Sequence, residues 1–256
     1  MMKLVAWNVN GVRARLDALL GWIDAEAPDV LLLQETKVTD DKFPRAPFEE
    51  RGYHLALWGS APLNGVAILA KQEPRDVVRG LPGEDGDTMA RWIEATVGPF
   101  RIASLYLPNG TSVGSDSFAY KLRYFDRIGA RMSALAEDGV PVIVGGDWNV
   151  APEACDVHDP ASWDGSICYH PDERAAWRRV VNRGFYDAYR WLNPAGEDYS
   201  WWHYQARSFE LGHGLRIDHF LLSPRAMDRA TACRIDRAPR AAKTASDHAP
   251  IILEAA

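Results

Sequence analysis

The chain has 256 residues, of which 47% are hydrophobic and 25% charged, and its formal net charge is −6 at pH 7. This composition excludes a disordered or fibrous chain and is typical of a globular protein with a sizeable apolar core. The acidic balance argues against a protein that coats nucleic acid by charge alone, because non-specific DNA affinity comes mainly from basic residues that neutralise phosphates.

Short apolar runs along the chain predict buried strands, because they are rich in β-branched and aliphatic residues and too short for buried helices. In chain order these strands are residues 3–7, 30–33, 65–70, 92–97, 101–107, 140–144, 219–222 and 250–253. Three segments begin with polar residues and end at Gly or a similar helix-ending residue. This pattern predicts helices over residues 14–26, 115–138 and 172–183. Strands outnumber helices and several follow one another directly, so we expect an α/β protein with sheets packed together and helices outside.

The sequence shows no sign of a membrane segment or a secretory signal. The longest apolar runs stop at Glu35 and Asp147, well short of the ~20 residues that span a bilayer, and the N-terminus reaches the polar Asn8 early. Three cysteines without a C-x-x-C pair argue against a disulfide framework or a zinc site. We expect one domain over residues 1–256, acting as a monomer in the cytoplasm. The irregular segment 151–171 is long enough to predict a functional loop.

Polar side chains recur where the predicted strands begin or end. A single such residue is usually a cap or a turn former, but six strands repeating the pattern are hard to assign to turns alone. In a twisted sheet or a pair of sheets, such strand ends can converge on one edge. We therefore expect one site there, formed by Asn8, Glu35, Tyr106, Asn109, Asp147, Asn149, Asp218, Asp247 and His248.

This set of side chains has a coherent chemistry. Its carboxylates and amides offer the oxygen ligands that Mg²⁺ prefers, from Glu35 and Asn8 with Asp218 or Asp247. Two further residues, Asp147 and His248, are titratable. Asn149 and Tyr106 are neutral hydrogen-bond donors, which suit an anionic, five-coordinate phosphorus. The pattern indicates phosphoryl transfer to water. Without a Walker loop, a nucleophilic Ser elbow or a zinc pair, NTPase, α/β-hydrolase and zinc-deaminase functions are disfavoured.

Six sequence blocks resemble the signature blocks of the exonuclease III family of abasic-site endonucleases, in family order and across nearly the whole chain. They are Trp-Asn-Val-Asn-Gly-Val-Arg-Ala-Arg at 7–15, Leu-Gln-Glu-Thr-Lys at 33–37, Tyr-Leu-Pro-Asn-Gly at 106–110, Gly-Gly-Asp-Trp-Asn at 145–149, Leu-Arg-Ile-Asp at 215–218 and Ser-Asp-His-Ala-Pro at 246–250. The fourth and last blocks alone indicate only the wider endonuclease/exonuclease/phosphatase superfamily. The first two narrow the resemblance to this family.

The resemblance implies a four-layer α/β sandwich, in which two mixed β-sheets pack face to face with helices outside. The active site of such a fold lies at strand ends on one edge. The resemblance also implies dependence on Mg²⁺, with Mn²⁺ as a substitute ion. Glu35 is then the principal metal ligand, with Asn8 beside it, Asp247 as a second-position ligand and Lys37 supporting the site.

By the same resemblance, Asp218 orients the imidazole of His248 and favours its protonated form. Asp147 matches the general base for the attacking water, and Asn149 orients that water or stabilises the transition state. The identity of the base and the number of metal ions, one or two, stay open at this stage.

The implied substrate is double-stranded DNA with abasic sites or 3′ ends. Tyr106 and Asn109 would contact the scissile phosphate. An apolar pocket that accepts a base-less deoxyribose is implied for Trp201, Leu215 and Ile217. Contacts that position the DNA backbone without reading its sequence are expected from Arg91, Lys121, Arg123 and Arg216.

Two alternative functions use the same fold. A superfamily phosphatase or phosphodiesterase for inositol phosphates or lipid headgroups would need the same metal and histidine machinery, but the Asn-Gly-Val-Arg-Ala-Arg string and Trp201 disfavour it. A non-catalytic DNA-binding relative is disfavoured because the set of strand-end residues is intact. The balance among cleavage 5′ of abasic sites, 3′–5′ exonuclease activity and removal of 3′-blocking groups stays open.

Overall fold

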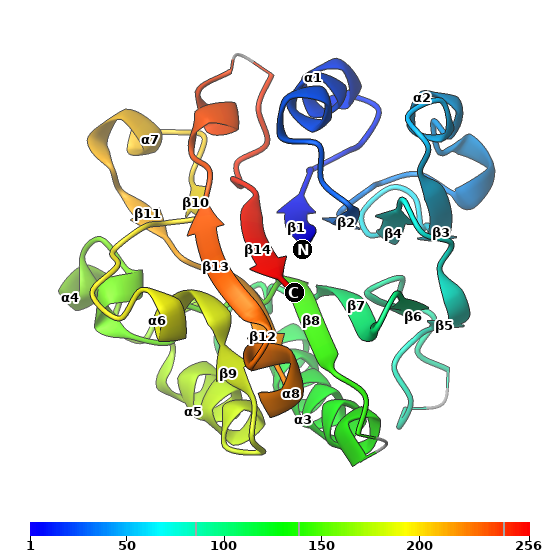
Figure 1. The fold of residues 1–256 in the computed structure, drawn as a ribbon. Helices are drawn as coiled ribbons and strands as arrows, with labels where there is room; N and C mark the ends of the chain where they lie inside the picture. The colour runs from blue at the N-terminus through cyan, green and yellow to red at the C-terminus, as the bar shows by residue number, and fades with distance from the viewer. Residues whose placement is uncertain (85, 138, 243) are drawn as a thin grey trace.

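Two six-stranded mixed sheets form the centre of the computed structural model, which describes residues 1–84, 86–137, 139–242 and 244–256. The first sheet runs in the order β13 (Ala230–Ile235), β14 (Ile251–Ala255), β1 (Met2–Asn8), β2 (Val30–Gln34), β4 (Val66–Ala70) and β3 (His54–Trp58) (Figure 1). The second runs β5 (Arg75–Arg79), β6 (Trp92–Val97), β7 (Phe100–Tyr106), β8 (Val142–Asp147), β12 (Asp218–Leu222) and β9 (Tyr186–Asp187). A separate two-stranded ribbon consists of β10 (Trp201–Trp202) and β11 (Gly214–Leu215).

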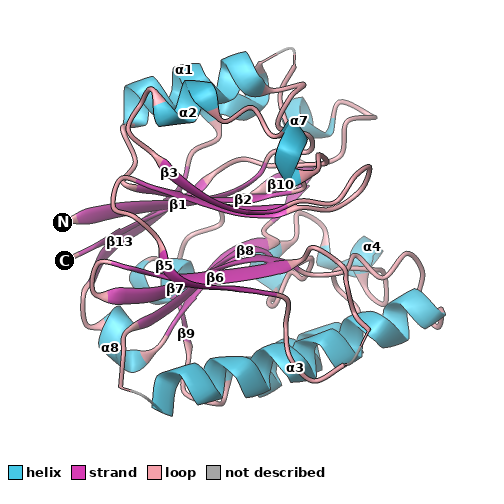
Figure 2. Cartoon of the chain, turned by 90° about the vertical axis from the view of Figure 1, so that its right-hand side faces the viewer, coloured by secondary structure: helices cyan, strands magenta, loops and turns pink. Residues whose placement is uncertain are grey.

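Helices cover the outer faces of both sheets. Figure 2 shows α1 (Leu16–Glu26) and α2 (Ala46–Glu49) over the first sheet, and α3 (Asp116–Glu137) and α8 (Pro224–Met227) over the second. The other helices are α4 (Pro160–Trp163), α5 (Pro171–Val181), α6 (Ala188–Leu192) and α7 (Ser208–Leu211), with 3-10 turns η1 (Asp40–Lys42), η2 (Ala154–Asp156) and η3 (Ala238–Ala241). This arrangement confirms the predicted four-layer sandwich. None of the described helices is long and apolar enough to cross a membrane.

The strands read as continuous apolar runs because both of their faces are buried. On β1, Leu4 and Ala6 belong to the core between the two sheets. Val5 and Trp7, which point to the opposite face, belong to a second core that also contains Leu19 of α1. Alternate residues of one strand therefore serve two cores.

The eight predicted strands and three predicted helices are all present, with ends shifted by a few residues. The last helix begins earlier than predicted, at Pro171, because proline suits the first position of a helix and Glu173 completes a capping box there. The helix predicted over 115–138 ends at Glu137 among the described residues, and residue 138 lies outside them. The patterns missed β3, β5 and β13, and also the two-residue strands β9, β10 and β11. Most of β5 is exposed, so it carries no apolar run.

Strand direction brings the polar ends to a single edge. The pairs β1–β2 and β7–β8 are parallel, so each pair ends together, near Asn8 and Glu35 in one sheet and at Tyr106 and Asp147 in the other. β12 runs antiparallel to β8 and begins with Asp218 opposite Asp147. β14 runs antiparallel to β1 and starts at the same edge. Both chain termini lie at the opposite end of the sheets in Figure 2.

Candidate active site

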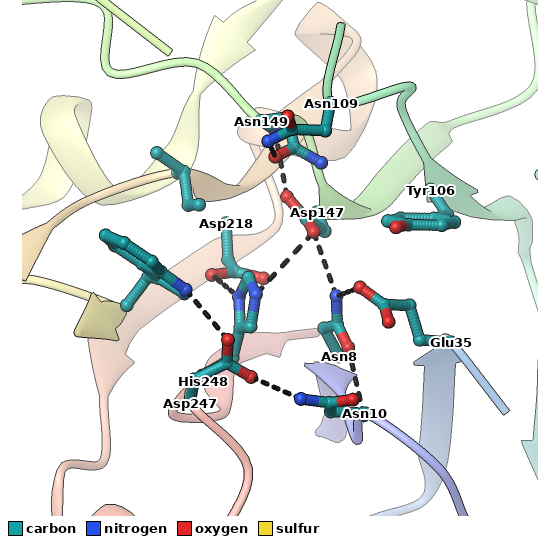
Figure 3. Close-up of polar contacts among 12 residues, drawn as sticks. Asn8, Asn10, Glu35, Tyr106, Asn109, Asp147, Asn149, Asp218, Asp247 and His248 are labelled. Carbon is teal, nitrogen blue, oxygen red and sulfur yellow. Dashed lines mark hydrogen bonds and ion pairs between the residues drawn. The ribbon is translucent and has the colours of Figure 1, made fainter. Parts of the chain in front are cut away.

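Asn8 links the two sheets at this edge. Its amide Nδ2 donates to Glu35 Oε1 at 2.8 Å and to Asp147 Oδ2 at 2.9 Å, so carboxylates from opposite sheets share one donor (Figure 3). Asn8 is fully buried, whereas the side chain of Glu35 keeps 15% of its surface exposed. Glu35 thus faces solvent from a fixed position. Its backbone adopts a left-handed φ of 49°, which turns the chain sharply at the end of β2.

Asn10 is a site residue that strand-end reasoning did not single out, although it lies inside the first signature block. Its Nδ2 donates to Asp247 Oδ1 at 2.9 Å, and its Oδ1 accepts from Lys37 Nζ at 2.6 Å. Lys37 also pairs with Glu35 Oε2 at 2.7 Å. Asn10 therefore joins the Glu35 side of the site to the Asp247 side.

His248 is held between two buried carboxylates. Its Nδ1 lies 2.9 Å from Asp218 Oδ2, which also accepts from Ser200 Oγ at 2.7 Å, and its Nε2 lies 3.7 Å from Asp147 Oδ2. Burial alone would lower the pKa of His248, but Asp218 and Asp147 outweigh it and raise that pKa to about 10. The imidazole is therefore protonated near neutral pH, with its Nε2 directed toward the site.

Asp147 also has a raised pKa, but here burial is the main cause. Burial, together with the neighbouring Asp218, outweighs the lowering effect of His248 and raises the pKa of this carboxyl to about 7. Its Oδ1 accepts from the backbone N–H of Asn149 at 2.9 Å. A carboxylate with this pKa can take a proton near neutral pH, which is the property required of a general base.

Two asparagines and a tyrosine complete the polar wall. Asn109 Nδ2 donates to Asn149 Oδ1 at 3.0 Å, and Asn149 Nδ2 donates to the carbonyl of Leu107 at 2.9 Å. Burial, with Glu35 next, raises the pKa of Tyr106 well above its usual range, so its phenol stays neutral and can donate a hydrogen bond. The guanidinium of Arg91 lies 4.7 Å from the centre of the Tyr106 ring.

These residues line a pocket of about 460 Å³ whose other wall is apolar. The apolar wall contains the three predicted residues Trp201, Leu215 and Ile217. The segment 151–171 adds side chains that the motifs did not indicate, namely Trp163, Ile167 and Cys168. Trp201 packs edge-on against Trp163 with ring centres 6.5 Å apart, and its Nε1 donates to Asp247 Oδ2 at 3.0 Å. The predicted functional loop is thus part of the pocket.

Two of the predicted DNA-backbone contacts are corrected by the structure. Lys121 and Arg216 are both 0% exposed, so neither can reach a phosphate on the surface. Lys121 pairs with Glu173 inside the protein, and Arg216 pairs with Asp156. Arg123 is more than half exposed and lies 3.7 Å from Glu84.

The donor atoms in the site fit a hard cation. Glu35 presents carboxylate oxygens, which suit Mg²⁺ or Mn²⁺. Asn8 turns its Nδ2 toward Glu35 and Asp147, and its Oδ1 accepts from the backbone N–H of Asn10 at 3.0 Å, so its role as a metal ligand stays a prediction. A group of three residues with ligand atoms within 4.8 Å of one another also exists, Asp147, Asp218 and His248. Within that group the imidazole already uses Nδ1 for Asp218, which favours a hydrogen-bonded unit there. Both carboxylate oxygens of Asp247 accept hydrogen bonds, from Asn10 and Trp201, so its role as a metal ligand stays a prediction.

Comparison with known proteins agrees with this geometry. Residues 5–248 match the endonuclease/exonuclease/phosphatase family. The chain is 34% identical to exodeoxyribonuclease III of Haemophilus influenzae over 99% of both chains. It superposes on an AP endonuclease from Archaeoglobus fulgidus with a TM-score of 0.95 at 35% identity, covering 100% of this chain and 99% of the other. It also superposes on the 3′ phosphatase NExo from Neisseria, bound to a product DNA hairpin, with a TM-score of 0.98 at 34% identity and full coverage of both. By sequence and by structure, the chain belongs to the endonuclease/exonuclease/phosphatase family.

Proposed function

We propose that this chain is a metal-dependent phosphodiesterase of DNA repair, which cuts duplex DNA 5′ of abasic sites, removes 3′-terminal nucleotides or removes 3′-blocking groups. The observation that carries the proposal is the pocket itself. One wall holds a paired base and acid, Asp147 and His248, beside the carboxylate of Glu35, and the other wall is apolar. Relatives named exodeoxyribonuclease III, AP endonuclease and 3′ phosphatase support DNA as the substrate.

The cation would be held by Glu35 and Asn8, with Asp247 as a second-position ligand. When bound, Mg²⁺, or Mn²⁺ in its place, supplies positive charge that stabilises the developing charge on the phosphoryl oxygens. Asn8 holds Glu35 in place through the 2.8 Å hydrogen bond to Oε1. Lys37 at 2.7 Å from Oε2 orients this carboxylate.

Asp147 and His248 are the acid–base groups of the proposed reaction. Asp147 accepts the proton of the attacking water, and the backbone N–H of Asn149 fixes the carboxylate through Oδ1. His248, protonated and held by Asp218, presents Nε2–H to the negative charge that develops on the phosphoryl oxygens. As the new P–O bond forms, the bond to the leaving 3′ oxygen breaks, and that oxygen takes up a proton from solvent. Tyr106 and Asn109 donate neutral hydrogen bonds to the same phosphate.

Substrate choice would depend on the apolar wall. Trp201, Leu215 and Ile217 offer a surface for a deoxyribose without its base, and they carry no hydrogen-bonding side chain that could recognise an inositol ring, apart from the indole N–H already given to Asp247. This feature disfavours the inositol-phosphate alternative. The enzyme is proposed to work as one domain and as a monomer in the cytoplasm, where chromosomal DNA of the nucleoid would be its substrate.

The experiment that tests this function compares four substrates in Mg²⁺ and in EDTA. They are duplexes with one abasic-site analogue, with a recessed 3′ end or with a 3′-phosphate, and an inositol phosphate. We expect cleavage of at least one DNA substrate in Mg²⁺ and none in EDTA. Glu35→Gln keeps the side-chain volume but removes the charge that holds the cation, so it should lose most activity while its circular dichroism is unchanged.

Four results would contradict the proposal. Full wild-type activity in EDTA, or normal turnover of Glu35→Gln at low Mg²⁺, would remove the metal assignment. Hydrolysis of the inositol phosphate without cleavage of any DNA would favour the phosphatase alternative. DNA binding without turnover on any substrate would favour a non-catalytic relative.

A further inference from the structure

Lys121 and Glu173 form an ion pair that is fully buried behind the polar wall of the pocket. Lys121 lies on α3 and Glu173 in the first turn of α5, and both side chains are 0% exposed. A buried charge is costly unless it is paired and its remaining hydrogen-bonding atoms are satisfied. The other contacts of the pair show how its remaining hydrogen-bonding atoms are satisfied and what the pair holds in place.

The ammonium group of Lys121 has three protons and three acceptors. Besides the carboxylate of Glu173, its Nζ donates to the backbone carbonyl of Asn149 at 2.7 Å and to that of Asn109 at 3.0 Å. These carbonyls belong to the two asparagines whose side chains are bonded to each other at 3.0 Å on the pocket surface. One buried cation thus fixes the backbone beneath both of them.

The two asparagines need such support because they lie in loops. Asn149 follows β8 with a left-handed φ of 46°, a conformation that is sparsely populated by residues other than glycine. Asn109 precedes Gly110, whose φ of +94° lets the chain pass close to the Lys121 stem. Glu173 extends the linkage, since its Oε2 accepts from the backbone N–H of His170 at the end of the segment 151–171.

We propose that Lys121, neutralised by Glu173, is a positioning residue that sets the side chains of Asn109 and Asn149 at the scissile phosphate. The inference rests on the proposed function, because it deepens the role of the same site. Lys121 does not touch the substrate. It acts on the reaction through two backbone carbonyls, and a small displacement of the asparagines is enough to lower the rate, since a 1 Å misplacement can cost on the order of 10²-fold.

The test uses the double variant Lys121→Met, Glu173→Gln. Removing Lys121 alone would leave Glu173 charged, buried and unpaired, and the protein could fail to fold, whereas removing both charges together is often neutral for folding. In this double variant we expect kcat on the best DNA substrate to fall about 10²-fold, with KM changed much less. A matched control, Glu94→Gln, removes another fully buried carboxylate that pairs with Arg101, and should leave kcat unchanged.

A double-mutant cycle shows whether the effect passes through the asparagines. In an Asn149→Ala, Asn109→Ala background, the same two substitutions should add little to the loss of kcat, because residues that act as one unit are not additive. Normal kcat in a folded double variant would overturn the proposal. So would a loss that multiplies fully in the asparagine background, or a loss confined to KM.

A second readout does not depend on activity. The side-chain amide signals of Asn109 and Asn149, identified in ¹⁵N spectra by substitution, should shift or broaden in the double variant, while those of Asn64, a buried residue that contacts Met89, should not. Unchanged signals from both asparagines would refute the positioning role even if no substrate were cleaved. Inactivity of the wild type on every DNA would instead refute the proposed function.

Discussion

Three buried groups carry the charge at the centre of the site, namely His248, Asp218 and Asp147. Asp218 accepts hydrogen bonds from both the His248 ring and Ser200, and these bonds hold its carboxylate in one position during the reaction. Its Oδ1 has no hydrogen-bond partner among the described residues, although it is buried. Asp218 therefore favours the protonated imidazole, and this protonated group is what the reaction needs at Nε2.

The pair Asp218–His248 should behave as one unit in mutagenesis. His248→Asn should lower single-turnover cleavage by about 10²–10⁴-fold, the usual effect of losing a positioned acid or base, and Asp218→Asn should have a smaller effect. The double variant should resemble His248→Asn alone. Cleavage of abasic duplex gives the rates, and binding in Ca²⁺ gives the affinity. Multiplied effects of the two substitutions would show that the residues act independently.

Asp147 should make the protein less stable as the pH rises. Burial raises its folded-state pKa to about 7 from an ordinary value of 3.8, so between these values the folded state binds a proton that the unfolded state has released. Stability contributed by this proton is complete below pH 4 and is lost as the pH passes 7. In EDTA, the Tm of Asp147→Asn relative to wild type should therefore increase from pH 4.5 to pH 7.5. A Tm difference that stays constant over this range would contradict the raised pKa.

At the scale of elements, the apolar wall of the pocket is assembled from two distant segments. Arg216 lies between the pocket residues Leu215 and Ile217, and its buried guanidinium bonds Asp156 at 2.7 Å and Asp187 at 2.8 Å. Its backbone N–H donates to the carbonyl of Asp156 at 2.8 Å. The segment 151–171 is thereby tied to the strands that carry the pocket.

Arg216→Met should test this linkage through stability. The substitution leaves Asp187 buried without this guanidinium and leaves Asp156 with Arg190 alone. The free energy of unfolding in urea should therefore fall by about 3–5 kcal/mol. Arg234→Met is a suitable control, because Arg234 is 46% exposed and its ion pair with Glu26 should contribute less than about 1 kcal/mol. Equal losses for the two variants would show that the buried network has no special role in holding the segment.

The sequence predicted the elements better than it predicted these buried charges. Strands with both faces buried produce apolar runs that are visible locally, and their polar ends marked most of the site. Lys121 and Arg216 were predicted to contact the DNA backbone, where basic residues position the phosphates. Their partners Glu173 and Asp156 are 52 and 60 residues away in sequence, so no local pattern could reveal the pairs.

At the scale of the whole molecule, the net charge of −6 would repel DNA, so a local basic region of the surface must attract it. The loops after β1 and β2 supply one beside the site, where Arg13, Arg15 and Lys37 surround a shallow depression. Arg15 and Lys37 are already bonded to Asn10, whereas Arg13 is exposed. Arg13 is therefore the residue of this group that is best placed to meet a phosphate.

The salt dependence of DNA binding should identify that contact. Each phosphate neutralised contributes about −0.9 to the slope of log K against log salt, because condensed counterions are released. In EDTA, where binding proceeds without cleavage, Arg13→Ala should reduce the magnitude of the slope by about 1 in fluorescence anisotropy titrations with abasic duplex. Arg75→Ala provides the comparison, since this exposed arginine lies in β5 opposite Thr96, at the end of the sheet away from Tyr106. If both substitutions change the slope equally, binding follows the overall charge of the protein and the basic loop is not a specific contact.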